Sequence, residues 1–252
     1  MAKTYFVTGM TKDYLWKSER LRASFPLLKS CDPYVMTVGF DMPGGDNFKT
    51  VRLEPTAQKS NQQGQFLDVI PTQDDDVVIM ADADSCVQRD LTPAELEQFH
   101  NLDGVLGMGA NSHFGQDALF EFNLCKPKVG PEVMEHVLGL KLKDLVVYNV
   151  GLCVAKPPVW RRLRQKYEEI WAAADALCDN WRVCQLIQCA AAKLVGIDVV
   201  PLNYTVHSHQ HFGLRRGHSF RDGVLYFGDE VVFFPHAVEG LWGPRKVPIL
   251  TA

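Results

Sequence analysis

The sequence lacks the features of a secreted or membrane-bound protein. Its seven cysteines are odd in number and include no CxxC pair, which excludes a disulfide framework and predicts reduced thiols. The N-terminus has no apolar h-region followed by a cleavage site. No apolar run approaches the roughly 18 residues that a membrane span needs. We therefore expect a soluble, cytoplasmic protein without a membrane span.

The sequence also lacks internal repeats, low-complexity segments, a linker and an excess of basic charge. Its 26 Lys and Arg against 30 Asp and Glu give a net charge of −4, so no overall basic field attracts nucleic acid. An apolar content of 46% and a charged content of 22% are typical of a globular protein with a substantial core. We expect residues 1–252 to form a single domain.

The hydrophobic pattern predicts an α/β fold. The central run Val77–Ala81 is apolar without alternation, which is typical of a strand buried on both faces. The other expected strands are 5–9, 34–40, 104–109, 117–122, 145–155, 197–202 and 230–235. Helices are expected at 13–29, 58–70, from Thr92 onwards, and at 131–138, 157–176 and 179–195. This order predicts a Rossmann-like, mixed but mostly parallel sheet flanked by helices.

Asp82 and Asp84 directly follow the central strand. Ligands gather beyond the carboxyl ends of strands in open α/β sheets, and two carboxylates one residue apart can converge on a hard divalent cation. A solvated acidic turn is the simpler interpretation of so short a motif.

Three further polar motifs come later in the chain, and each also has a structural interpretation. Asn149-x-Gly151 fits a bulge in a strand. Asp179 fits a helix N-cap, and His236 fits an ordinary histidine at a strand end. The residues alone leave the metal-ligating histidine open, because the sequence also contains His207, His209, His211 and His218.

Taken in order, these motifs resemble glycosyltransferases of the GT-A fold, and most closely the retaining glycogenin-like and lipopolysaccharide galactosyltransferase group. The resemblance rests on 79–84 (Ile-Met-Ala-Asp-Ala-Asp), 148–151 (Tyr-Asn-Val-Gly), 179–180 (Asp-Asn), 202–204 (Leu-Asn-Tyr) and 236–242 (His-Ala-Val-Glu-Gly-Leu-Trp). It spans most of the chain. The sequence departs from the family where Asn180 replaces a glutamine and where the terminal Lys-Pro-Trp is absent.

The resemblance implies a role for each of these residues. Asp82, Asp84 and His236 would bind Mn²⁺ or Mg²⁺, while Asn149 and Asp179 would act at the sugar. Residues 1–110 would form a nucleotide-binding half and 111–252 an acceptor half. Contacts to the donor are expected from Val7, Thr8, Gly9, Tyr14, Asp82, Ala83, Gly151, Asn180, Gly240, Arg245 and Lys246.

The implied function is metal-dependent transfer of a sugar, with retention, from a nucleotide diphosphate sugar such as UDP-glucose or UDP-galactose. The acceptor hydroxyl would belong to a glycan, a protein or a modified nucleic-acid base, and Arg215, Arg216 and Arg221 could bind a polyanionic acceptor. Two alternatives remain. One is a nucleotidyltransferase, which would normally have a GxGxR-type loop that 8–12 (Thr-Gly-Met-Thr-Lys) lacks. The other is a non-catalytic nucleotide-sugar-binding protein, in which replacing the Asp pair would abolish no metal-dependent turnover.

Overall fold

The structure is a computed structural model that describes residues 2–54, 64–109, 117–178, 182–209 and 216–236. The helices are α1 (Glu19–Ser24), α2 (Pro93–His100), α3 (Ala118–Leu124), α4 (Pro131–Leu138), α5 (Pro157–Ala174) and α6 (Val183–Leu194). Short 3-10 helices lie at Lys12–Tyr14, Phe25–Leu27, Gln65–Asp68, Leu142–Asp144 and Asp175–Leu177. No helix in these ranges is both long enough and apolar enough to cross a membrane.

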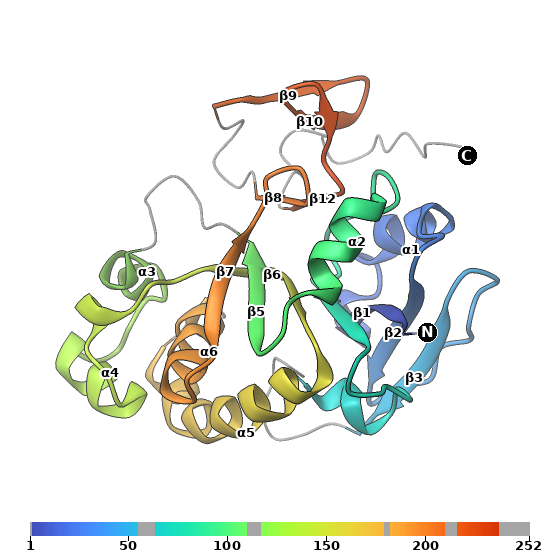
Figure 1. Ribbon diagram of the computed structural model, residues 1–252. Helices are drawn as coiled ribbons and strands as arrows, with labels where there is room; N and C mark the ends of the chain where they lie inside the picture. Colours follow the sequence, from blue (N-terminus) through green and yellow to red (C-terminus); the bar gives the residue numbers. More distant parts are fainter. Residues whose placement is uncertain (1, 55–63, 110–116, 179–181, 210–215, 237–252) are drawn as a thin grey trace.

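A seven-stranded mixed sheet forms the centre of the molecule (Figure 1). Its strands are β1 (Thr4–Thr11), β2 (Asp32–Val38), β3 (Lys49–Leu53), β4 (Val77–Ala81), β5 (Val105–Gly109), β6 (Asn149–Ala155) and β7 (Asp198–Leu202). The order is β3-β2-β1-β4-β6-β5-β7, and only β6 runs antiparallel to its neighbours, β4 and β5. The predicted mixed, mostly parallel sheet is confirmed.

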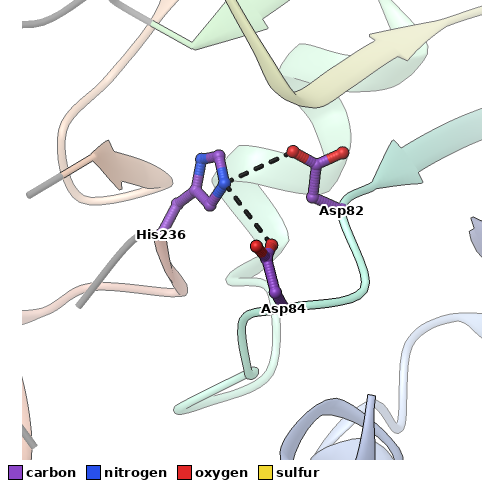
Figure 2. A group of neighbouring side chains, drawn as sticks. All are labelled: Asp82, Asp84 and His236. Atoms are coloured by element: carbon purple, nitrogen blue, oxygen red, sulfur yellow. Dashed lines mark ion pairs between the residues drawn. The ribbon is translucent and has the colours of Figure 1, made fainter. Parts of the chain in front are cut away.

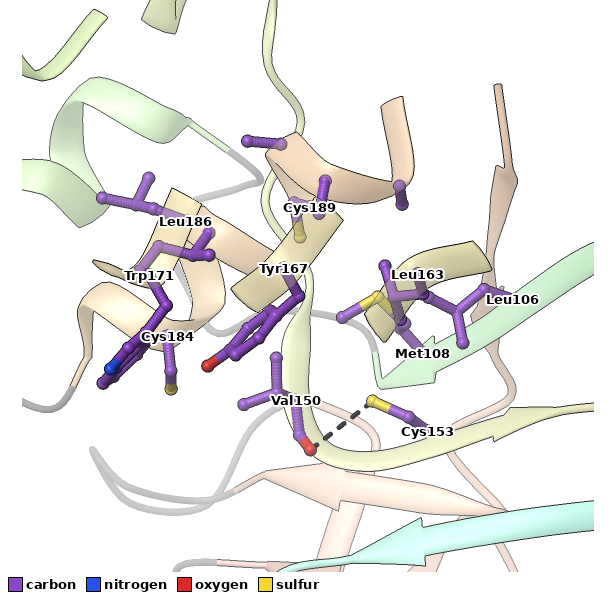
Figure 3. Packing of buried hydrophobic residues seen from close by; sticks show 14 of the residues in the cluster. Leu106, Met108, Val150, Cys153, Leu163, Tyr167, Trp171, Cys184, Leu186 and Cys189 are labelled. Atoms are coloured by element: carbon purple, nitrogen blue, oxygen red, sulfur yellow. Dashed lines mark hydrogen bonds between the residues drawn. The ribbon is translucent and has the colours of Figure 1, made fainter. Parts of the chain in front are cut away.

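Two apolar cores lie on the two faces of this sheet. Tyr5 and Val7 of β1 belong to the core that includes α3 to α6, while Phe6 between them belongs to the core that includes α1 and α2. Figure 3 shows the first core, where Tyr167 and Trp171 of α5 stack with ring centroids 5.7 Å apart. Because both faces are covered, all five residues of β4 are buried, as its unalternating pattern predicted.

Several of the expected elements were wrong or incomplete. The segment expected as a strand at 117–122 forms α3, because Asp117 Oδ1 caps the helix by accepting from the Phe120 N–H at 3.0 Å. The expected helix at 13–29 is broken into α1 and two 3-10 turns. The helix expected at 58–70 lies partly outside the described residues, and its described part contains only a 3-10 helix. β3 was not anticipated.

Short strands form a second layer beyond the carboxyl edge of β4 (Figure 1). They are β8 (His207–His209), β9 (His218–Arg221), β10 (Val224–Phe227), β11 (Glu230–Val231) and β12 (Phe234–His236). β8 pairs with β12, while β9, β10 and β11 form a separate antiparallel sheet. The single strand expected at 230–235 is therefore two short strands.

The loop that follows the Asp pair holds this second layer in place. Ser85 Oγ donates to the carbonyl of Pro235, and the Gln88 N–H donates to that of Phe233 at 3.0 Å. Gln88 Oε1 also accepts from the Leu225 N–H at 3.2 Å. The backbone beside β12 is thus fixed to the backbone beside β4.

Arg89 makes the strongest of these connections. Its guanidinium donates to the carbonyls of Val231 at 2.8 Å and Thr205 at 3.0 Å, and it forms a bidentate pair with Glu95. Glu95 in turn completes a capping box with Thr92 at the start of α2, as the sequence predicted. Burial alone would raise the pKa of Glu95, but the hydrogen bonds from Arg89 and Thr92 outweigh it and lower the pKa.

We expect Glu95→Gln to reduce the free energy of unfolding at pH 7 by about 1–3 kcal/mol, because it keeps the capping box but removes a charge-assisted pair. A lowered carboxyl pKa stabilises the fold above the unfolded-state pKa, and this contribution disappears as the pH falls through the folded-state value. The difference between variant and wild type should therefore shrink below about pH 4.5. Urea denaturation at several pH values measures it.

Asp74→Asn is the matched control, because Asp74 pairs with Arg161 on the exposed surface. Its effect at pH 7 should stay below about 1 kcal/mol. Equal losses in the two variants would contradict the structural role assigned to the Arg89–Glu95 pair.

Candidate metal centre

Asp82 and Asp84 directly follow β4, at the place in the sheet where the order of successive strands reverses. The ladder between β1 and β4 ends at the pair Thr8–Ala81, whereas β1 continues to Thr11 alongside β2. The chain proceeds from β1 outward to β2 and β3 and then returns to β4 on the other side of β1. In open α/β sheets ligands bind at the carboxyl edge beside such a switch point, and the Asp pair lies at this edge.

The antiparallel direction of β6 brings the Asn149-x-Gly151 motif to the same edge. Because β6 runs opposite to β4, its first residues lie beside the end of β4. The Asp82 N–H donates to the Gly151 carbonyl at 2.9 Å. Two motifs that are far apart in the sequence are thus joined by a backbone hydrogen bond.

His236 lies at the end of β12 and faces both aspartates (Figure 2). Its Nε2 is 3.3 Å from Asp82 Oδ2 and 3.7 Å from Asp84 Oδ1. One ligand atom from each of the three residues lies within 4.8 Å of the others. Carboxylate oxygens suit hard divalent cations and an imidazole favours the transition metals, so this donor set fits a divalent metal ion.

Gly151 makes room for the imidazole ring. A Cβ at position 151 would lie 2.1 Å from His236 Nδ1 and 2.2 Å from its Cε1. No side chain can occupy that space unless His236 moves away from the carboxylates. The glycine of the Asn-x-Gly motif is therefore a steric requirement for the metal centre.

The two carboxylates also change the protonation of His236. Burial of the ring disfavours its charged form, but the hydrogen bond and charge of Asp82, together with the charge of Asp84, outweigh burial. The net effect raises the pKa of His236 above its ordinary value. The two carboxylates therefore favour the protonated form of the ring, whose charge would partly balance theirs.

Asn149 connects His236 to a buried chain of polar side chains. Asn149 Oδ1 accepts from the Gly151 N–H at 2.8 Å and lies 3.2 Å from His236 Nδ1. Asn149 Nδ2 donates to Gln185 Oε1 at 3.2 Å, and Gln185 Nε2 donates to Glu121 Oε1 at 2.7 Å. These side chains come from β6, α6, α3 and β12, so this series of hydrogen-bonded side chains crosses the interior of the protein.

The sequence analysis missed Gln185 and Glu121. Gln185 lies in a run of ten buried residues, Val183 to Ala192, where a glutamine among apolar side chains is the available signal. Glu121 offered none, because its segment was expected to form a strand. Its carboxylate also pairs with Arg182 at 3.2 Å, just before α6.

The residues expected at the nucleotide differ in exposure. Val7, Thr8 and Ala83 are buried, Gly9 is half-buried and Tyr14 is exposed. The buried side chains can offer a ligand little beyond their backbone groups. The remaining expected contacts and one expected catalytic residue lie outside the described residues: Asp179, Asn180, Gly240, Arg245 and Lys246.

The histidine-rich segment lies beside the metal centre. The ring of His209 is 4.9 Å from that of His236, centroid to centroid, and the ring of His207 is 5.6 Å from it. Among the described residues, however, only His236 joins the Asp pair in a group that could hold a metal. Arg216 is exposed two residues before β9 and Arg221 is exposed at its end, while Arg215 lies outside the described residues.

Comparison with solved structures identifies the fold. The crystal structure of the galactosyltransferase LgtC in complex with donor and acceptor sugar analogues matches with a TM-score of 0.52 and 16% sequence identity. The match covers 81% of this chain and 75% of the galactosyltransferase. At this identity the likeness shows a shared fold, which confirms the expected GT-A architecture. No family model and no curated protein matches the sequence.

We expect Gly151→Ala to abolish cation binding, because the new methyl group displaces the His236 ring. Thermal unfolding with and without Mn²⁺ measures this, since a ligand of the native state raises the melting temperature. The wild type should be stabilised by Mn²⁺, and the variant should not.

Gly44→Ala serves as the control, because its Cβ would lie 3.4 Å from the nearest atom, the Phe48 carbonyl oxygen, in ordinary contact. A Gly151→Ala protein that folds and keeps the full Mn²⁺ shift would refute the steric role of Gly151.

Proposed function

We propose that this protein is a glycosyltransferase that moves a sugar from a nucleoside diphosphate sugar to a hydroxyl acceptor with the help of a divalent cation. The observation that carries the proposal is the convergence of Asp82, Asp84 and His236 at the switch point of a GT-A fold. The shared fold with a galactosyltransferase supports the reaction class. UDP as the nucleotide, Mn²⁺ as the ion and retention of configuration rest on the sequence resemblance.

The proposed chemistry follows from charge. When the sugar departs from its donor, negative charge develops on the nucleoside diphosphate, and a bound divalent cation would offset that charge. Asp82, Asp84 and His236 would hold this cation between the sheet and the donor phosphates. Asp84 is the side chain we expect to matter most for binding, because the second Asp of this motif usually binds the metal directly in the family that the sequence resembles.

The remaining site residues divide between donor and acceptor. We assign Gly9 and Tyr14, beyond the β1–β4 ladder, to the nucleotide, and Asp179 to the sugar. Arg245 and Lys246 are proposed diphosphate contacts. Arg216 and Arg221 are exposed on the layer above the metal centre and are available to an acceptor, including an anionic one.

The nucleotide and the cation dependence can be measured together. We expect UDP with Mn²⁺ to raise the melting temperature more than GDP, CMP or dTDP with Mn²⁺ does, because only the matching base gains contacts at the carboxyl edge of the sheet. EDTA should remove most of the UDP effect, since UDP would bind together with the cation that Asp82, Asp84 and His236 would hold. Equal shifts for all four nucleotides, or a UDP shift that survives EDTA, would contradict this assignment.

Asp84→Ala should reduce Mn²⁺-dependent hydrolysis of UDP-glucose or UDP-galactose by at least about 100-fold, because charge stabilisation of the leaving group is lost. The rate of UDP release measures this. Asp75→Ala is the control, because Asp75 is exposed at the opposite end of the same strand. Turnover that is equally fast in wild type and Asp84→Ala would sink the enzyme proposal and favour a non-catalytic binding protein.

A further inference from the structure

The side-chain amides in the buried polar chain that begins at His236 can each take only one orientation. Asn149, Gln185, Glu121 and His236 are each at least nine-tenths buried, with exposed fractions of 5%, 2%, 3% and 5%. Polar groups at this depth need partners, because water cannot reach them. Each amide in the chain therefore has to place its oxygen and its nitrogen correctly at the same time.

The Glu121 carboxylate fixes one end of the chain. An ionised carboxylate only accepts hydrogen bonds, so Gln185 must turn its NH₂ group toward Glu121, at 2.7 Å. This leaves Gln185 Oε1 facing Asn149, whose NH₂ group donates to it at 3.2 Å. Asn149 Oδ1 is then the atom that faces His236.

The backbone of Gly151 fixes the other end independently. Its N–H can only donate, and it lies 2.8 Å from Asn149 Oδ1. A flipped Asn149 would place its NH₂ group against this N–H and its oxygen against Gln185 Oε1, so neither hydrogen bond could form. Both ends thus require the same orientation of Asn149, with an acceptor oxygen 3.2 Å from His236 Nδ1.

We propose that Glu121, Gln185 and Asn149 form a positioning chain that sets the tautomer of His236. Asp82 and Asp84 also only accept, so in the protein without a cation their charges attract the imidazole proton to Nε2. When a cation takes the place of that proton, Asn149 Oδ1 holds the remaining proton on Nδ1, and the Nε2 lone pair is directed at the space between Asp82 and Asp84. Nε2 is the nitrogen that faces both carboxylates, so this tautomer is the one that can bind a cation there. The inference rests on the proposed cation-dependent function and adds Gln185 and Glu121 to its machinery.

This chain also assigns Asn149 a role other than the sugar contact that the resemblance implies. Its oxygen accepts from both Gly151 and His236, and its nitrogen donates to Gln185. Asn149 is therefore a positioning residue that acts through His236. Glu121 lies furthest from the metal ligands and acts as the anchor of the chain.

The first test is made without metal on the Asp82→Ala/Asp84→Ala variant, which removes the charges that compete with Asn149 for the imidazole proton. Nitrogen-15 NMR of the histidine side chains at high pH, where the imidazole is neutral, distinguishes a proton on Nδ1 from one on Nε2. The His236 signal is identified by its loss in His236→Gln. We expect the Nδ1–H form, and an Nε2–H form would overturn the proposal whether or not the protein is a glycosyltransferase.

The second test uses Gln185→Met, which replaces the amide by an apolar side chain of similar length. The Kd for Mn²⁺, measured by calorimetry, should rise about 10- to 100-fold, as for the loss of other partners of metal-binding histidines. In the Asp82→Ala/Asp84→Ala background, the His236 signal should also lose its single Nδ1–H form. A folded Gln185→Met protein with unchanged Mn²⁺ affinity and unchanged tautomer would overturn the proposal.

Gln188→Met is the matched control. Gln188 is equally buried on the same helix, but its NH₂ group donates to Cys153 Sγ and it takes no part in the chain. Its substitution should change neither the Kd for Mn²⁺ nor the His236 signal. Equal effects at both positions would indicate a general disturbance of α6 and would overturn the specific role of Gln185.

Discussion

The imidazole ring of His236 lies directly against the backbone of Gly151, and the metal centre depends on this contact. The ring can approach only because position 151 has no side chain. The same glycine accepts a hydrogen bond from the Asp82 N–H and donates one to Asn149. One residue therefore links the strand before the Asp pair, the partner of the histidine and the histidine itself. A change there alters all three distances at once, whereas a change in an outlying loop alters none of them.

The site is built from apolar and polar packing, and the two differ in how well they tolerate amino-acid substitution. Around it, apolar side chains on both faces of the sheet can exchange for others of similar volume at modest cost. The polar chain from His236 to Glu121 cannot, because a buried partner left unpaired costs about 1–3 kcal/mol. An apolar core would fill the same space, so the chain is better explained by the orientation it imposes on His236 than by stability. In the proposed arrangement, Gln185 is a positioning residue on the buried part of α6.

The sequence predicted β4 and α4 with their observed bounds. The signal for β4 is an unalternating apolar run, and the signals for α4 are Pro131 at its first position and Gly139 directly after its last. It failed at α3, where the aromatic residues around Phe120 suggested a strand and the N-cap at Asp117 was overlooked. The antiparallel direction of β6 was not predictable, since pairing between strands distant in sequence leaves no local pattern. His236 was distinguished from the other histidines by the family resemblance alone, and its geometry supports that choice. The chain through Gln185 depends on contacts between four elements and could not be read from the sequence.

The way the second layer is attached explains how the site can persist while the sequence changes. Ser85, Gln88 and Arg89 bind the backbone carbonyls of Pro235, Phe233 and others, and a carbonyl is present whatever the side chain. Exposed residues of this layer can therefore change without loss of these backbone bonds, whereas Leu225 and Val232, which pack with Cys86, also hold the layer through their side chains. This attachment holds His236 beside Asp82 and Asp84 through main-chain groups, and the fold shared with a galactosyltransferase at 16% identity shows how far side chains can change while such an architecture persists.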